Sequence, residues 1–292
     1  MVIEWWQICL IAPDLEIHRM INPGTVEHVA TQARRDVLRM VHLANASHVG
    51  SCLSVVDILA TLYTGILRVK PEDPDWVDRD RLILSKGHAG AALNAILARR
   101  GFFDPRWLDD YCGNGAMLAG HATHEGVPGV ELSTGSLGHG LPVACGMAIH
   151  GKRSGRSYRV FTILSDGECD EGSVWESALL APQHGLDNLI VIIDYNKIQS
   201  LGDVADIIDL APLADKWRSF RWAVTEVDGH NVGEMISVLE RLPLESGRPT
   251  CVIAHTVKGK GVSFMENQLA WHYKSPDADQ LIRALDEIVD PS

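Results

Sequence analysis

Two predicted strand ends, thirty residues apart, carry the clearest chemistry in this sequence. An apolar run over residues 159–164 leads into Asp166-Gly167, and a second run over residues 189–193 leads into Asn196. In an open α/β sheet, ligands collect where parallel strands end. Asp and Asn oxygens on two such ends suit Mg²⁺ carrying a diphosphate, because that ion takes few protein ligands and keeps phosphate oxygens. Asp-Gly alone is common in surface turns, so the second strand end is what favours a site.

Composition and charge restrict the kind of partner. Hydrophobic residues make up 46% of the 292 residues and charged residues 22%, as in ordinary soluble globular proteins. The net charge of −12 and the absence of any Lys/Arg run argue against a nucleic-acid partner. The Asp-Gly turns and histidine-rich loops therefore point to a small molecule.

Cysteine usage and hydropathy predict the compartment. Six cysteines are scattered without a CxxC pair, which favours reduced thiols in a cytoplasmic protein over a disulfide framework or a zinc site. We expect no membrane-spanning segment, because no apolar stretch approaches the length that a membrane helix needs. Residues 1–22 make a poor signal peptide, since no basic segment precedes their apolar run. We interpret them as an arm of unknown role, or as the result of an upstream start with Met20 as the usual beginning.

Hydrophobic periodicity predicts alternating helices and strands. Helices are expected over residues 23–45, 89–99, 140–151, 173–184, 232–242 and 277–288, with a further helix after residue 54 that Ser54 would cap. Strands are expected over residues 81–84, 158–164, 189–194, 222–227 and 250–255. Alternation with short links predicts an α/β fold, a parallel sheet with helices on both faces, in one domain over residues 23–292.

One long segment lacks periodicity. Residues 101–138 are rich in glycine, histidine and aromatic residues. A loop of this length in a compact protein is usually functional or disordered. Its apolar content and its regularly placed glycines favour a functional loop.

Nine short motifs, taken in chain order, resemble the N-terminal, thiamine-diphosphate-binding half of transketolase, especially the split form in which two genes encode the two halves. They are NASHVGSCLS (45–54), SKGHAG (85–90), AGH (119–121), STGSLGHGLPVACGMA (133–148), SDGECDEGSVWE (165–176), DYNKIQSLG (194–202), VDGHN (227–231), HTVKGKG (255–261) and WHYKSP (271–276). The resemblance covers roughly residues 24–290. It implies the diphosphate-type fold of thiamine enzymes and thiamine diphosphate with Mg²⁺ as cofactors, Ca²⁺ or Mn²⁺ being able to replace the Mg²⁺.

The resemblance implies particular cofactor and metal residues. Asp166, Asn196 and the backbone carbonyl of Ile198 would hold the metal. The other cofactor-binding residues would be His88 and His272, Gly135, Ser136 and Leu137 along the aminopyrimidine ring, Gly167 beside the diphosphate, and Glu168 and Glu171. For Glu171, which the family places at a subunit contact, the alternative is an acidic residue that merely favours a helix N-terminus.

The resemblance also implies catalytic histidines. His48 and His272 would exchange protons near the reacting hydroxyls, and His121 would bind the C1 hydroxyl of the donor. An isolated histidine is more often structural, and His124 competes with His121 because Ala122 stands where the family usually has proline. Four further residues leave alternatives open. His139 replaces the commoner glutamine, His230 reads as a turn former, and Lys258, with Lys260, either reaches a phosphate or lies in a solvated loop.

Transketolase resemblance implies transfer of a two-carbon ketol unit from a ketose or ketose-phosphate donor to an aldehyde-type acceptor. The glutamate that activates the cofactor belongs to a second, pyrimidine-binding domain, which would begin about where Ser292 ends this chain. We therefore expect the partner to be a C-terminal transketolase subunit, in an α₂β₂ assembly. Apolar surface on the helix at 140–151 and around Trp175 should face it.

Two other interpretations remain. The chain could belong to an acyloin-forming or 2-oxo acid decarboxylating thiamine synthase in a biosynthetic pathway. It could also be a degenerate, non-catalytic scaffold, although intact Asp166, Asn196, His88 and His272 count against that.

Overall fold

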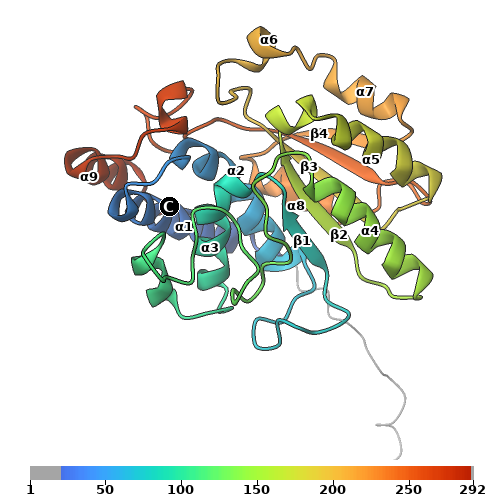
Figure 1. Cartoon of the computed structure of the whole chain (residues 1–292), viewed down its shortest axis with the longest axis horizontal. Helices are drawn as coiled ribbons and strands as arrows, with labels where there is room; N and C mark the ends of the chain where they lie inside the picture. The colour runs from blue at the N-terminus through green and yellow to red at the C-terminus, as the bar shows by residue number, and fades with distance from the viewer. Residues whose placement is uncertain (1–20, 291–292) are drawn as a thin grey trace, which may run out of the picture.

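A computed structural model describes residues 21–290, and their five strands form a single parallel sheet (Figure 1). The spatial order is β1 (Arg81–Leu84), β2 (Val160–Ser165), β3 (Leu189–Tyr195), β5 (Thr250–His255) and β4 (Ala223–Asp228). Every residue of β2 is buried, as are the first six of β3. Such continuous apolar strands are typical of a parallel sheet covered on both faces.

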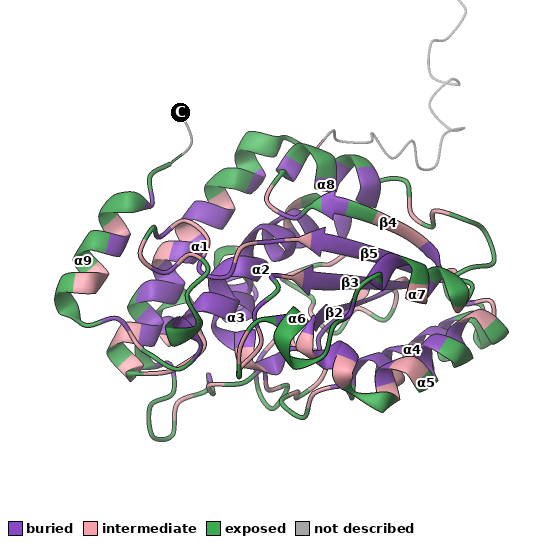
Figure 2. Ribbon diagram, turned by 90° about the horizontal axis from the view of Figure 1, so that it is seen from above, coloured by how far each residue is buried: buried purple, intermediate pink, exposed green. Residues whose placement is uncertain are grey.

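Helices cover the two faces of this sheet (Figures 1 and 2). One hydrophobic cluster joins it to α1 (Pro23–Ala44), α2 (Val49–Thr61), α3 (Gly90–Arg99) and α8 (Val232–Leu239), with α9 (Ala278–Glu287) outside α1. A second cluster joins the other face to α4 (Gly140–Arg153), α5 (Gly172–Gln183) and α7 (Leu213–Ser219). Neighbouring residues along β2 and β3 alternate between the clusters, as the strand period of two requires. The predicted fold class is confirmed.

The beginning of α2 differs from the prediction. The helix starts at Val49, with His48 as its N-cap residue at φ 72°, so Ser54 lies inside the helix and the prediction that it caps the helix is wrong. All thirteen residues of α2 are buried, and this tertiary packing outweighs the weak helix propensity of Gly50 and Ser51. The Ser54 hydroxyl instead donates to the carboxylate of Asp194 at the end of β3, 2.6 Å away.

The same helix also corrects the expectation about apolar length. Together with the π-helical turn η1 (Leu62–Ile66), α2 forms an apolar stretch of 18 residues, Val49–Ile66, which by length and hydropathy alone could cross a membrane. In the structure 89% of this stretch is buried inside the protein. It serves as the central helix of the larger hydrophobic cluster.

Irregular segments make up much of the rest. Between α3 and α4 the chain contains one short 3₁₀ helix, η3 (Pro105–Asp110), among the described residues and otherwise follows the expected irregular path. Two short helices, α6 (Val204–Ile207) and α7, were not predicted. Residues 1–20 of the predicted arm lie outside the described residues, whereas Ile21 packs against the larger cluster and Asn22 caps α1. The division into an arm and one domain stays a prediction.

Candidate active site

The strand ends bring the proposed metal-binding oxygens to one edge of the sheet. Asp166 follows β2 and Asn196 follows β3, the neighbouring strand in register with it. Both side chains are almost completely buried. Backbone amides of Gly167 and Lys197 donate to the Asp166 carboxylate, and the Asn196 amide nitrogen donates to the Ser54 hydroxyl at 3.3 Å. With its nitrogen bonded to Ser54, the Asn196 side chain directs its carbonyl oxygen away from that hydroxyl. The oxygen accepts a hydrogen bond from the backbone amide of Ile198 at 3.2 Å.

Among residues 21–290, no cationic side chain is bonded to the buried carboxylate of Asp166, which accepts from backbone amides. Burial, followed by the nearby carboxylate of Asp194, raises the pKa of Asp166 to about 6. A buried charge is costly unless it is paired or coordinates a metal. Within residues 21–290, no group of three or more His, Cys, Asp or Glu side chains is arranged to hold a metal ion. One carboxylate with an amide and a carbonyl oxygen fits a hard divalent ion that keeps other oxygen ligands.

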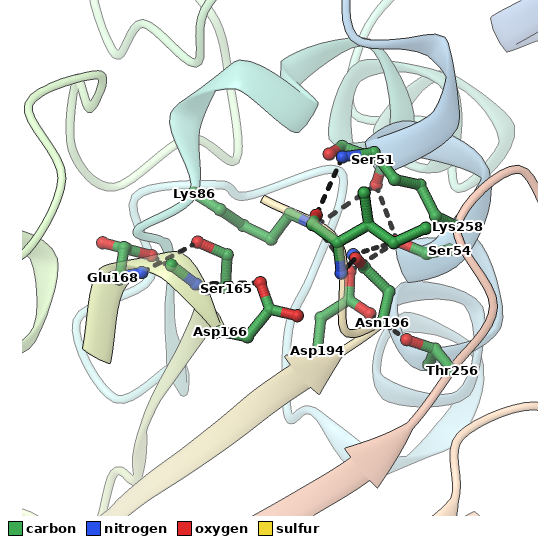
Figure 3. Close-up of polar contacts among 12 residues, drawn as sticks. Ser51, Ser54, Lys86, Ser165, Asp166, Glu168, Asp194, Asn196, Thr256 and Lys258 are labelled. Carbon is green, nitrogen blue, oxygen red and sulfur yellow. Dashed lines mark hydrogen bonds and ion pairs between the residues drawn. The ribbon is translucent and has the colours of Figure 1, made fainter. Parts of the chain in front are cut away.

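Two buried lysines, Lys86 and Lys258, supply positive charge near the candidate metal ligands Asp166 and Asn196 (Figure 3). Lys258 is fully buried, and its ammonium donates to the Ile198 carbonyl at 2.9 Å and to Nδ1 of His272 at 2.8 Å. Burial, followed by the charge of Lys86, lowers the pKa of Lys258 to about 8. The solvated-loop alternative for Lys258 is therefore wrong. Lys260, by contrast, lies near Glu266 on the surface side.

A second buried network was not predicted from the sequence. Asp194 and Lys86 are both fully buried and form an ion pair, and Asp194 also accepts hydrogen bonds from the hydroxyls of Ser54 and Thr256 (Figure 3). The lysine and these hydrogen bonds keep the pKa of Asp194 below its ordinary value against the opposing effect of burial. The available signal was the position of Lys86 in the SKGHAG turn, directly after β1. The network connects the ends of β1, β3 and β5 to α2.

The four predicted histidines meet above these strand ends. Ring centroids of His48 lie 5.2 Å from His88, 5.7 Å from His121 and 5.1 Å from His272. They come from four separate segments, and the backbone amide of His48 donates to the carbonyl of His272 at 2.9 Å. His124 instead hydrogen-bonds the Ser133 hydroxyl at 2.8 Å. The geometry thus favours His121 over His124 as the histidine that faces the site.

Three histidines of this cluster, His48, His88 and His272, are held neutral at physiological pH. Burial, followed by the charge of His121, lowers the pKa of His48 to about 4. Burial, followed by Lys258, lowers that of His272 to about 3. Burial and Lys86 also hold the pKa of His88 well below its ordinary value. Because Lys258 donates to Nδ1 of His272, the proton of this neutral ring is on Nε2.

These groups line a cavity of about 230 Å³. Its walls contain most of the predicted site residues, together with Ser51, Ser165, Gln199 and Ser200, which were not predicted as site residues. The lining consists of His48, Ser51, His88, His121, Gly135, Leu137, Ser165, Asp166, Gly167, Asn196, Ile198, Gln199, Ser200 and His272. A larger hollow of about 390 Å³ lies between residues 74–79 and 124–131. There the charged Arg79 and Glu131 side chains pair with each other, so we place the chemistry in the smaller cavity.

Glu168 holds the cavity wall from behind. Its fully buried carboxylate accepts hydrogen bonds from the Ser85 hydroxyl, from the Gly138 amide at 2.9 Å and from the Ser165 amide at 3.0 Å. The side chain thus ties the end of β1, the 135–140 segment and the end of β2 together. Among the predicted cofactor residues, Glu168 is placed to position the others and is not part of the cavity lining.

The remaining predicted residues flank this wall. Ser136 is exposed next to the two lining residues Gly135 and Leu137. Glu171 is exposed and is the N-cap residue of α5. Gly138, which has φ 79°, lies against it: a Cβ at position 138 would be 2.6 Å from the Cβ of Glu171, which is a clash. His139 is exposed, with its ring bonded to the carbonyl of Leu137.

Ala122 also has a defined place in this wall. Its amide donates to the Gly87 carbonyl at 3.0 Å, and its carbonyl accepts from Thr134. A proline could not make the first of these bonds. The departure from the family pattern at this position therefore adds a tether between the loop and the Gly87 turn.

Comparisons with known proteins agree with this arrangement. Residues 26–287 match the family described as "Transketolase, thiamine diphosphate binding domain". The chain is 42% identical over 247 residues to a 6-deoxy-6-sulfo-D-fructose transketolase subunit of a Clostridium species, covering 85% of this chain and 90% of the relative. It is also 42% identical over 276 residues to an apulose-4-phosphate transketolase subunit of Actinobacillus succinogenes, covering 92% and 100%.

A solved structure extends the similarity to a longer chain. Transketolase from Campylobacter jejuni superimposes with a TM-score of 0.86 at 29% identity, covering 91% of this chain but 43% of that one. The chain thus spans nearly the full length of the subunit relatives and less than half of the Campylobacter enzyme. With its predicted fold and motifs confirmed, this chain belongs to the transketolase family, where it corresponds to the N-terminal, thiamine-diphosphate-binding domain.

Proposed function

We propose that this chain is the N-terminal subunit of a two-component transketolase, which binds thiamine diphosphate with Mg²⁺ and transfers a two-carbon ketol unit from a ketose to an aldehyde-type acceptor. The observation that carries the proposal is the convergence of Asp166, Asn196 and the Ile198 carbonyl beneath a cluster of four histidines in one cavity. Relatives named as transketolase subunits, matched over most of their length, support it.

The protein's own part is to hold the cofactor and to manage protons. When bound, thiamine diphosphate supplies the electron sink for cleaving the carbon–carbon bond beside a ketone. Asp166, Asn196 and the Ile198 carbonyl would hold its metal ion, and Gly167 would leave room for the diphosphate. His88 would hydrogen-bond the diphosphate.

His48 and His272 would exchange protons with the hydroxyl groups of the sugar. A neutral imidazole can donate one hydrogen bond and accept another, so His48 would be able both to give and to take a proton at a hydroxyl. His272 has its acceptor nitrogen engaged by Lys258, so it presents its Nε2–H to the substrate. His121 would bind the donor at its C1 hydroxyl.

Exposed apolar side chains support the partner requirement. Leu179 and Leu180 on α5 are 60% and 42% exposed, and Val143 on α4 is 37% exposed. Trp175 does not contribute as expected, because it is half-buried against Trp217 and Phe220. We propose that this face of α4 and α5 meets other subunits in a cytoplasmic α₂β₂ assembly. The C-terminal subunit would supply the cofactor-activating glutamate.

The donor class follows from the chemistry of the relatives. One relative is named for a sulfonated ketose and another for a ketose phosphate. We propose a ketose or ketose phosphate as donor here as well. Groups that would bind a terminal phosphate belong to the proposed partner.

Calorimetry on the assembled subunits tests the proposal. Thiamine diphosphate should bind with Mg²⁺ present and should fail to bind measurably when EDTA removes the metal. Replacing Asp166 with alanine should abolish the metal-dependent binding. Unchanged affinity in that variant would place the metal site elsewhere.

A further inference from the structure

His230 connects a buried ion pair to the loop that carries Lys258. It lies in the VDGHN turn after β4, where its Nδ1 is 2.7 Å from a carboxylate oxygen of Asp57 in α2. On the other side of the ring, the backbone amide of Val257 donates to Nε2 at 2.8 Å. The imidazole therefore bridges α2 and the segment that follows β5.

The tautomer of this imidazole is fixed by its partners. Because an amide N–H can only donate, Nε2 of His230 is the acceptor and the proton is on Nδ1, from which it is donated to Asp57. Asp57 is itself held by both terminal nitrogens of Arg34, and its side chain and that of Arg34 are nine-tenths buried. Arg34 and His230 hold the pKa of Asp57 at about 2, against the opposing effect of burial. The carboxylate is thus a fixed acceptor that orients the ring.

The residue after Val257 is Lys258. Its ammonium reaches Ile198 and His272, two residues of the candidate active site. The other bonded backbone amides of residues 256–260 donate to backbone carbonyls, those of Tyr195, Gly50 and Val257. Among these amides, that of Val257 is the one held by a side chain.

We propose that His230 is a positioning residue that holds the Lys258 loop in place for binding of the metal–diphosphate end of the cofactor. This inference rests on the proposed function. It follows the logic of outer-shell carboxylate–histidine pairs, in which a carboxylate orients an imidazole and the imidazole fixes a group at the site. The turn-forming reading of His230 assigns no role to its ring, which bridges two elements.

The first test follows the loop without any cofactor. His230→Phe keeps a ring but removes both hydrogen bonds, whereas His230→Gln retains one donor and one acceptor. The matched control is His255→Phe, because His255 also pairs with a carboxylate, that of Glu226, at a neighbouring strand end. Hydrogen exchange of the full chain should become at least tenfold faster over residues 257–259 in H230F, near wild type in H230Q and unchanged in H255F. Unchanged exchange in H230F would overturn the proposal.

The second test separates positioning from general structural support. With the partner subunit present, H230F should raise the Kd for magnesium thiamine diphosphate by about 10–100-fold, the range seen for outer-shell residues. In a Lys258→Met background the same change should raise Kd less than twofold, because residues that act as one unit are not additive. An equal factor in both backgrounds would overturn the proposal. A wild-type complex without affinity for the cofactor would instead contradict the proposed function, and the exchange test would still decide the role of His230.

Discussion

At the scale of single residues, the site depends on buried charged side chains, and the described residues leave the charge of the Asp166 carboxylate unpaired. Asp166 could be predicted from the sequence because a carboxylate after an apolar strand is visible there, and Asn196 followed from its spacing. The Asp194–Lys86 pair and the burial of Lys258 could not be predicted, because full burial of a charged side chain depends on tertiary packing. Sequence patterns identify such residues as polar and place them on the surface by default.

Asp166 should lower the stability of the metal-free chain. Its folded-state pKa of about 6 lies above the ordinary value of 3.8, so at neutral pH the ionised carboxylate costs on the order of 2–3 kcal/mol. This cost disappears as the pH falls from about 6 towards 4, because Asp166 takes up its proton at a higher pH in the folded chain than in the unfolded chain. Asp166→Asn should therefore raise the Tm of the EDTA-treated chain at pH 7.5 but have little effect near pH 4.

The matched control is the exposed Asp109→Asn, which should leave Tm unchanged at both pH values. The same D166N variant should lose metal-dependent cofactor binding. A lower Tm at pH 7.5 than wild type would show that the carboxylate stabilises the metal-free fold, contrary to this account.

Turnover should depend on His48 and His272 more than cofactor affinity does. Replacing either with alanine should lower kcat by about 10²–10⁴-fold, the usual contribution of a positioned proton-transfer group. Steady-state assays on the assembled enzyme would measure this change, and calorimetry would measure the cofactor Kd. His124→Ala, outside the cluster, serves as the control and should keep wild-type turnover. Wild-type kcat in either of the first two variants would remove that histidine from the mechanism.

At the scale of elements, the sequence located the strands and most helices to within two or three residues, because long periodic segments carry a strong signal. The prediction that Ser54 caps a helix was wrong, because its hydroxyl bonds to Asp194 at the end of β3. The short helices α6 and α7 carry too few turns for a periodic pattern. The wall formed by residues 135–140 could be predicted as a functional loop, but its attachment through Glu168 could not.

Loss of the Glu168 carboxylate should loosen three elements together. Glu168→Ala would leave the Gly138 and Ser165 amides and the Ser85 hydroxyl without their buried acceptor. Each unsatisfied buried group costs about 1–3 kcal/mol, so we expect the free energy of unfolding to fall by at least about 2 kcal/mol in urea titrations. Exposed Glu171→Ala is the control and should change it by less than about 0.5 kcal/mol. An equal, small effect of both substitutions would refute this role of Glu168.

At the scale of the whole molecule, the fold forms the candidate cavity at one edge of the sheet and leaves apolar side chains of α4 and α5 exposed to solvent. Leu180→Glu on α5 should weaken assembly with the other subunits without unfolding the chain, because the side chain is already 42% exposed. Leu43→Glu, at the end of α1 and 65% exposed, is the matched control. Light scattering of co-purified subunits would show the L180E complex dissociating at concentrations where L43E stays assembled. Equal assembly of both variants would exclude Leu180 from the interface.

The most direct measurement is ketol transfer itself, with this chain by itself, with the C-terminal subunit by itself and with the two combined, each with Mg²⁺ and thiamine diphosphate. The two subunits together should transfer a two-carbon unit from a ketose donor to an aldehyde acceptor, and neither should do so without the other. Omitting the metal or replacing Asp166 with alanine should abolish the transfer. Full-rate turnover of a ketose by this chain without its partner would contradict the account, because the proposal assigns the cofactor-activating glutamate to the C-terminal subunit.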